Sequence, residues 1–134
     1  MEKQKQKHIA LETANKMLPL VRPITEDIVK NWTEVDEAVQ LLREQKESKQ
    51  SEEVQLQTTT RIHKLTRQLT ENLDELESLG CIVESYELGV IDFPSEMDGE
   101  DVMLCWSIKE NEISHYHKPG ETVKQRLLLK ETLE

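Results

Sequence analysis

Apolar residues in the first half of the chain recur at alternating intervals of three and four residues. One series consists of Ile28, Trp32, Val35, Val39 and Leu42. This spacing places all five side chains along one face of an α-helix, as in the seam of a coiled coil. A second series consists of Ile62, Leu65, Leu69, Leu73, Leu76 and Leu79. Gly80 comes directly after it, where a glycine in the left-handed conformation commonly ends a helix.

Residues 43–53 (REQKESKQSEE) separate the two series and contain almost no apolar side chain. We interpret them as two helix ends around a short polar turn. A single unbroken helix is the alternative, because the segment contains no Gly or Pro. Each helix would have about 27 residues and a length of roughly 40 Å at 1.5 Å per residue. The matched lengths predict an antiparallel helical hairpin.

Two prolines precede the first apolar series. We expect a short helical segment at residues 11–18, after which Pro19 and Pro23 interrupt the chain. Proline is best tolerated in the first turn of a helix, so a new helix is expected to begin near Pro19. Residues 1–8 are rich in Lys and Gln and are expected to form a frayed, solvated arm.

The spacing of apolar residues changes after Gly80 from a helical to an alternating period. Short strands are expected at residues 81–86, 90–93, 102–108 and 113–117, with Pro94 ending the second and Asp98-Gly99 forming a turn. Residues 119–134 show no decisive period. The sequence therefore predicts a single α+β domain, mainly α, over residues 1–134. It comprises a helical hairpin at 9–79, a small antiparallel β region of about four strands at 80–118, and a tail at 119–134.

The last two expected strands can be joined by a two-residue turn at Glu110-Asn111. The predicted pairs are Lys109–Glu112, Ile108–Ile113, Ser107–Ser114, Trp106–His115, Cys105–Tyr116 and Leu104–His117. Apolar residues then face apolar residues and polar residues face polar ones. In this register Cys105 points away from His117, which argues against a thiolate–imidazole nucleophile pair.

The composition is acidic, with 17 Lys and Arg against 27 Asp and Glu and a net charge of −10. This charge argues against binding to nucleic acid or to anionic membrane surfaces. No apolar run approaches the roughly 18 residues of a membrane span, and no apolar segment of a signal peptide follows the first residues. Cys81 and Cys105 are expected to be free thiols, and the protein is expected to be cytoplasmic.

Several short segments occur in one characteristic order. They are LETANKMLPLVRPI, LGC, LGVIDFP, VMLCW and EISHYH, within about residues 9–118. In this order they resemble the uncharacterised prokaryotic family catalogued as domain of unknown function 2203. Members of that family usually have Arg where this chain has Ser107, an aromatic pair where it has His115 and Tyr116, and a closing Gly-rich segment that it lacks. The resemblance implies no particular activity.

Asp92, Trp106 and His117 are the candidate ligand-binding residues of the β region. A carboxylate at Asp92 can act as a base or a ligand, and a structural role at a turn is the alternative. His115 and His117 could bind a metal from one strand face, but packing beside Trp106 explains them better, so we expect no metal site and no cofactor. The common phosphate, dinucleotide, hydrolase and zinc motifs are absent.

Two functions are consistent with these features. The first is a non-enzymatic interaction or structural protein, in which the helical hairpin pairs with a second copy as a homodimer of four helices or binds another protein. The second is a small-molecule or metal-binding protein, or an enzyme, with its site around Asp92 and His117. We favour the first, because the apolar seam is clear and catalytic motifs are missing.

Overall fold

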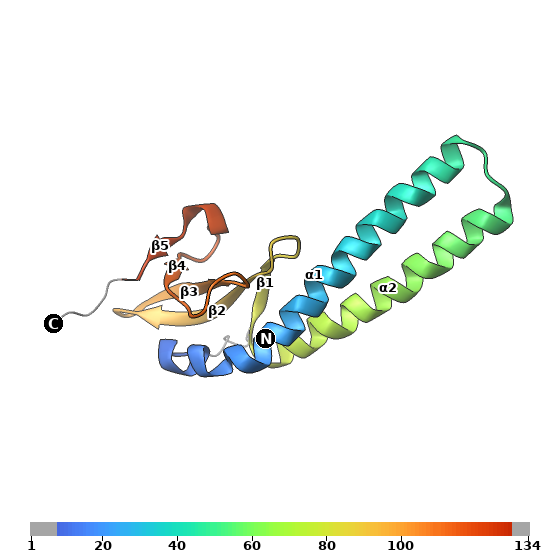
Figure 1. The fold of residues 1–134 in the computed structure, drawn as a ribbon. Coiled ribbons are helices and arrows are strands. Elements are labelled where there is room, and N and C mark those ends of the chain that lie inside the picture. The colour runs from blue at the N-terminus through green and yellow to red at the C-terminus, as the bar shows by residue number, and fades with distance from the viewer. Residues whose placement is uncertain (1–7, 130–134) are drawn as a thin grey trace, which may run out of the picture.

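Two long helices form the antiparallel hairpin that the apolar spacing predicts. A computed structural model describes residues 8–129, with α1 at Leu11–Glu47 and α2 at Glu52–Ser78 (Figure 1). The expected arm and tail therefore fall partly outside the described residues. Residues 48–51 form the short polar turn, and the Ser51 hydroxyl caps α2 by accepting from the Val54 N–H at 3.2 Å. The single unbroken helix is excluded.

The prediction that the prolines end one helix and begin another is wrong. Pro19 and Pro23 both lie inside α1. A proline within a helix removes one backbone hydrogen bond and bends the axis without necessarily ending the helix. Figure 1 shows such a bend, since the first, dark blue part of α1 lies along the sheet and the remainder rises beside α2. Buried Leu18, Val21 and Ile24 keep this segment helical by packing it on the sheet.

The end of α2 follows the predicted pattern. Gly80 has φ of +89°, its N–H donates to the Glu77 carbonyl at 2.9 Å, and the Cys81 N–H donates to the Leu76 carbonyl at 3.3 Å. These two bonds make up a Schellman motif, which satisfies the last carbonyls of the helix. The chain leaves α2 at once and enters the sheet.

Residues 8–129 contain five antiparallel strands, whereas the sequence predicted about four. They form one sheet, in which each strand lies beside the next strand along the chain. They are β1 (Ile82–Ser85), β2 (Val90–Met97), β3 (Glu100–Ser107), β4 (His115–His117) and β5 (Leu127–Leu128). Asp98 and Gly99 form the predicted turn, with φ of +53° and +80°. Sequence analysis missed β5, because a two-residue strand leaves no alternating pattern.

Pro94 lies within β2 and does not end it, contrary to expectation. β1 pairs with β2 only as far as Asp92, so β2 is an edge strand from there onward. Proline is tolerated on an edge, where its missing N–H breaks no ladder hydrogen bond. The Pro94 carbonyl instead accepts from the Ile9 N–H at 2.7 Å, which ties the start of the chain to this edge.

The predicted register between β3 and β4 is wrong by one residue. The observed pairs are Met103–His117, Leu104–Tyr116 and Cys105–His115. The strands are joined by residues 108–114 and not by a two-residue turn. Because side chains alternate along a strand, this shift exchanges the two faces of β4. It brings His117 to the same side of the sheet as Cys105.

The two faces of the sheet have different surroundings. One face carries Ile91, Phe93, Leu104 and Trp106, which form the apolar core with residues 18–28 of α1. The opposite face carries Asp92, Cys105 and His117. Figure 1 shows the C-terminal segment, with η1 (Val123–Gln125) and β5, on the side of the sheet away from the start of α1. The sheet is therefore covered on both faces.

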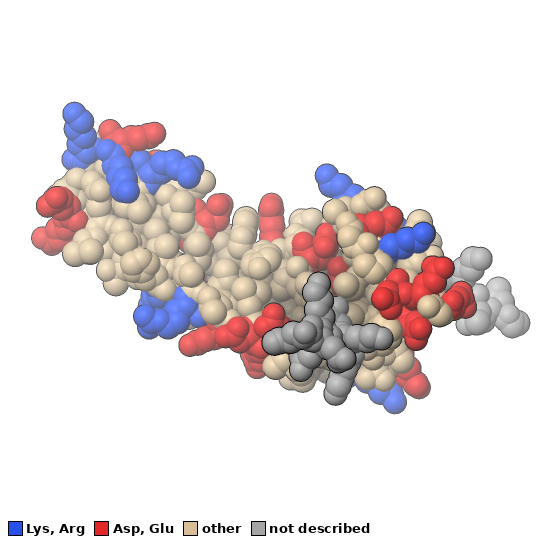
Figure 2. All heavy atoms as spheres, turned by 180° about the vertical axis from the view of Figure 1, so that it is seen from behind, with Lys and Arg blue, Asp and Glu red and all other residues tan. Residues whose placement is uncertain are grey.

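Charge is unevenly distributed over the surface. Figure 2 shows acidic side chains gathered at the sheet end of the molecule, where the β2–β3 turn contributes Glu96, Asp98, Glu100 and Asp101. Lys and Arg are more evident toward the tip of the helical hairpin (Figure 2). Neither helix among residues 8–129 combines the length and the apolar composition that a membrane crossing requires.

Gly89 is the point where the β1–β2 turn meets both α1 and the loop at residues 108–114. A Cβ there would lie 3.0 Å from methyl groups of Val29 and Ile108, whereas one at Gly99 would meet nothing within 4 Å. Both glycines have positive φ, so alanine at either costs about 1–2 kcal/mol. We expect Gly89→Ala to cost about 1–3 kcal/mol more than Gly99→Ala in urea unfolding, because only Gly89 adds overlap. Equal losses of stability for the two variants would show that the β1–β2 turn is not tightly packed against α1 and the loop at residues 108–114.

Candidate functional site

Three side chains from adjacent strands form a buried polar cluster beneath the C-terminal segment. Asp92 comes from β2, Cys105 from β3 and His117 from β4, and no more than 4% of any of them is exposed. One ligand-type atom of each lies within 4.8 Å of the other two. We call these three residues the polar cluster. Its existence depends on the observed register of β3 and β4, because the predicted one would separate Cys105 from His117.

The hydrogen bonds of His117 fix where its protons lie. Its Nδ1 is 2.9 Å from the Lys118 carbonyl oxygen, which can only accept, so Nδ1 carries a hydrogen. Its Nε2 is 2.9 Å from Oδ2 of Asp92. A hydrogen bond at this position requires one proton between the two groups. The pair is therefore either imidazolium with carboxylate or neutral imidazole with carboxylic acid.

Asp92 is held in an environment that opposes its charge. The pKa of its carboxyl is raised to about 6, chiefly by burial and also by the charge of Glu84, although the positive charge of His117 and hydrogen bonds from Cys105 and His117 act in the opposite direction. Its second oxygen, Oδ1, is buried and has no hydrogen-bond partner among the described residues. A buried acceptor without a partner lowers the stability of the fold by its desolvation free energy, and a bound ligand or a proton at this oxygen would offset that loss.

Cys105 is a protonated thiol at neutral pH. Its pKa is raised to about 12, chiefly by burial and also by the negative charge of Asp92, and the nearby Arg126 guanidinium offsets part of this rise. A nucleophilic cysteine needs a stabilised thiolate, so the pair of Cys105 and His117 does not have the character of such a site. Sequence analysis also rejected this pair, but its premise that the two residues lie on opposite faces is wrong.

An ion pair secures the segment that covers the polar cluster. Arg126 donates from Nη1 and Nη2 to the two carboxylate oxygens of Glu110, at 3.2 and 2.7 Å, and His115 lies 3.6 Å from the same carboxylate. The Val123 N–H donates to Glu84 of β1 at 3.0 Å. Sequence analysis missed Arg126 because residues 119–134 have no periodic pattern that could identify a contact.

Trp106 lies on the other face of the sheet and does not join Asp92 and His117. It is fully buried in the apolar core, its Nε1 donates to the Glu110 carbonyl at 2.9 Å, and the Arg22 guanidinium lies 4.9 Å from the ring centroid. Arg22 also donates to the Ile108 and Glu110 carbonyls at 2.7 and 2.8 Å. Trp106 and Arg22 therefore shape the loop at residues 108–114.

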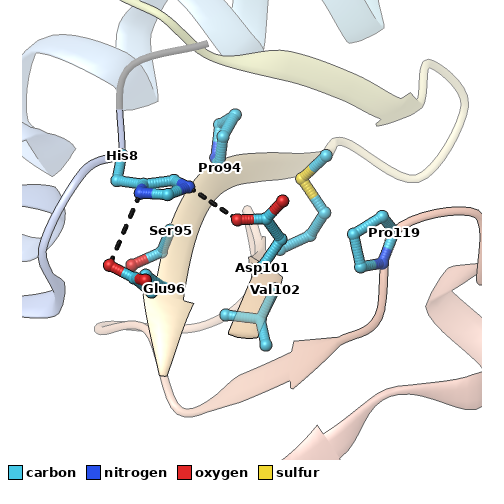
Figure 3. Close-up of a pocket in the computed structure, with 8 residues that line it drawn as sticks. His8, Pro94, Ser95, Glu96, Asp101, Val102 and Pro119 are labelled. Atoms are coloured by element: carbon cyan, nitrogen blue, oxygen red, sulfur yellow. Dashed lines mark hydrogen bonds and ion pairs between the residues drawn. The ribbon is translucent and has the colours of Figure 1, made fainter. Parts of the chain in front are cut away.

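An open surface pocket adjoins the polar cluster. Figure 3 shows His8 pointing toward Glu96 and Asp101, with Nδ1–Oε1 and Nε2–Oδ1 distances of 3.7 and 2.9 Å. The cavity has a volume of about 450 Å³, and its other lining residues include Pro94, Met103 and Pro119. None of the polar cluster lines it. The pocket is therefore a surface feature distinct from the polar cluster.

Comparison with protein families supports the resemblance seen in the sequence. The family described as Uncharacterized conserved protein (DUF2203) matches residues 7–129. The chain belongs to this family. No curated protein and no solved structure matches the chain. The family assignment supplies no activity, so the function has to be argued from the structure.

The segments that carry the DUF2203 resemblance converge in the fold. The LPLVR segment supplies Arg22, the DFP segment supplies Asp92, the LCW segment supplies Cys105 and Trp106, and the HYH segment supplies His117. All of them meet at β3, on one face or the other. These four segments therefore supply residues to two adjoining parts of the structure: the polar cluster, and the contacts of the loop at residues 108–114 that joins β3 to β4.

We expect Arg22→Gln to destabilise the protein by about 2–3 kcal/mol, through loss of two charged hydrogen bonds and of the contact with the Trp106 ring. The measurement is urea unfolding followed by fluorescence in a Trp32→Phe background, where Trp106 is the remaining tryptophan. Arg43→Gln, at an exposed position on the helical hairpin, is the matched control. A loss of stability no larger than that of the control would show that Arg22 does not stabilise the loop.

The Glu110–Arg126 pair makes stability depend on pH. Burial opposes ionisation of Glu110, but hydrogen bonds from Arg126 and the Ser107 N–H outweigh burial, so its pKa lies below the ordinary value. A lowered pKa contributes stability above the unfolded value of about 4.3, and this contribution is lost as pH falls through the folded value. We expect Glu110→Gln to cost about 1–2 kcal/mol at pH 7 and less below about pH 4. Glu112→Gln, exposed in the same loop, should show no such trend, and a pH-independent cost at Glu110 would contradict the ion-pair explanation.

Proposed function

We propose that this DUF2203 protein is a non-enzymatic cytoplasmic interaction protein that forms a homodimer through its helical hairpin. The observation that carries the proposal is the incomplete burial of the apolar seam. Ile28 is fully buried, but Trp32, Val35, Val39 and Leu42 are only half-buried. Two helices can each bury one stripe against the other, and here that packing leaves these four side chains partly exposed.

Within residues 8–129, no other helix or strand covers the outer part of the hairpin. In Figure 1 it extends away from the sheet, and the C-terminal segment lies at the opposite end. We call residues 28–72 the stem. Its leucines include Leu41 and Leu56, which are 46% and 64% exposed and lie on opposite sides of the turn at residues 48–51. Both lie on the helix faces away from the apolar series, at about 100° per residue, and exposed apolar side chains of this kind are typical of a surface that pairs with a partner.

A second copy is the occupant we propose for this surface. Two antiparallel hairpins that pack side by side form a four-helix arrangement, and a two-fold axis lets one surface serve both copies. Another protein that supplies helices of similar pattern is the alternative. The net charge of −10 disfavours nucleic acid as the partner, because phosphate binding needs an excess of Lys and Arg.

The test is the mass of the full chain in solution, measured by native mass spectrometry and light scattering. We expect a dimer, and we expect Leu41→Lys with Leu56→Lys to weaken it at least about tenfold, which is 1.4 kcal/mol. Because both side chains are already exposed, helicity should be preserved. The matched control is Leu20→Lys with Leu88→Lys, two leucines 54% exposed and nearer the sheet. A wild-type monomer, or equal weakening by both pairs, would overturn the proposal.

A further inference from the structure

We propose that the polar cluster is a binding site for a divalent transition metal of the zinc type, with Asp92, Cys105 and His117 as its three protein ligands. One carboxylate oxygen, one sulfur and one imidazole nitrogen are the donor types that Zn²⁺ takes in proteins. They come from three neighbouring strands, so the sheet itself fixes their relative positions. The proposal concerns the sheet and does not depend on dimerisation through the stem.

The spacing of the donors suits a small cation. Zinc binds its ligands at roughly 2.0–2.3 Å, which places tetrahedral donors roughly 3.3–3.8 Å apart. The three atoms lie within 4.8 Å of one another, and the closest pair, Asp92 Oδ2 and His117 Nε2, is 2.9 Å apart. Small side-chain rotations that open the hydrogen-bonded pair and draw in the sulfur would bring all three to coordination distance.

The second hydrogen bond of His117 is the one that a metal-bound histidine usually makes. Nδ1 donates to the Lys118 carbonyl, so Nε2 is the nitrogen left to offer a lone pair to the cluster. In metal sites this outer hydrogen bond fixes the tautomer and the direction of the ring. His117 is thus already oriented with its coordinating atom toward Asp92 and Cys105.

The free oxygen of Asp92 is a separate indication of a ligand. Oδ1 is buried without a hydrogen-bond partner among residues 8–129. Packing alone does not account for a carboxylate at this position, because the oxygen gains nothing to replace water. A cation beside the carboxylate supplies the missing interaction to either oxygen.

The charges balance when a divalent cation replaces two protons. Before binding, the cluster holds one proton on the Cys105 sulfur and one between Asp92 and His117. Binding of M²⁺ releases both, which leaves a carboxylate, a thiolate and a neutral imidazole around the cation with no net charge. Arg126, which lies near Cys105, is already paired with Glu110 and adds no uncompensated charge.

Three protein ligands leave the fourth tetrahedral position for water or an added ligand. Structural zinc sites usually have four protein ligands, whereas three ligands with an open position are typical of zinc that binds a reacting molecule. The C-terminal segment lies on this side of the sheet and is held by the Glu110–Arg126 and Glu84–Val123 contacts. Opening of that segment would admit a small ligand.

The experiment uses the full chain, reduced and freed of metal with a chelator, and titrates it with Co²⁺ and Zn²⁺. We expect one Co²⁺ per chain, a thiolate-to-cobalt charge-transfer band, the visible bands of a tetrahedral site, and displacement by Zn²⁺. The melting temperature should rise with metal. Cys105→Ser should abolish the charge-transfer band, and His117→Gln and Asp92→Asn should weaken binding at least about 100-fold.

Matched controls separate this site from other donors. Cys81→Ala removes the other buried thiol, and His115→Gln removes the neighbouring histidine of β4, so both should keep the band and the affinity. If a cluster variant fails to fold, the spectrum of the Cys81→Ala variant still decides whether Cys105 is the thiolate, because Cys105 is then the one cysteine left in the chain. Absence of stoichiometric binding, or a band that survives Cys105→Ser, would overturn the proposal. Either result leaves the dimer measurement unaffected.

Discussion

Glu110 joins the parts of the structure that are far apart in the sequence. Its carbonyl accepts hydrogen bonds from Arg22 of α1 and from the Trp106 indole, and its carboxylate accepts from the Ser107 N–H and from Arg126. The first two bonds place the loop at residues 108–114 on the core. The last bond fastens the C-terminal segment over the opposite face. One residue therefore connects the bent helix, the loop and the cover of the polar cluster.

The consequence of this arrangement is the register of β4. A two-residue turn would pair Leu104 with His117, and the observed loop pairs Met103 with it. The difference of one residue decides whether His117 points into the apolar core or toward Asp92 and Cys105. Hydrogen bonds from Arg22 and Trp106 to the carbonyls of this loop stabilise the longer form, in which the polar cluster can assemble.

Local patterns predicted the parts of the fold that local forces determine. The three-and-four spacing located both helices, Gly80 marked the end of α2, and Asp98-Gly99 located the β2–β3 turn. Each of these depends on neighbouring residues alone. Asp92 and His117 were identified as a pair through the family resemblance, and the structure places them in contact.

Contacts between distant residues account for the errors. Whether Pro19 and Pro23 end or bend α1 depends on how residues 18–24 pack on a sheet formed later in the chain. The register of β4 depends on Arg22, which lies 88 residues before Glu110. The position of Arg126 depends on the same glutamate. No periodicity within the strands or the tail contains this information.

Burying the polar cluster on a sheet face costs more free energy than burying apolar side chains there. Three apolar residues of similar size would pack there without the desolvation of a carboxylate and an imidazole, and replacement of buried polar groups by apolar ones is often neutral or stabilising. The hydrogen bond between Asp92 and His117 offsets part of the cost, but Oδ1 of Asp92 has no hydrogen-bond partner among the described residues. In the stem, Gln45 Oε1 is also buried without a hydrogen-bond partner among the described residues, but it belongs to a neutral amide. The cost of burying ionisable groups therefore lies in the sheet, and this is the reason to seek chemistry there and assembly at the stem.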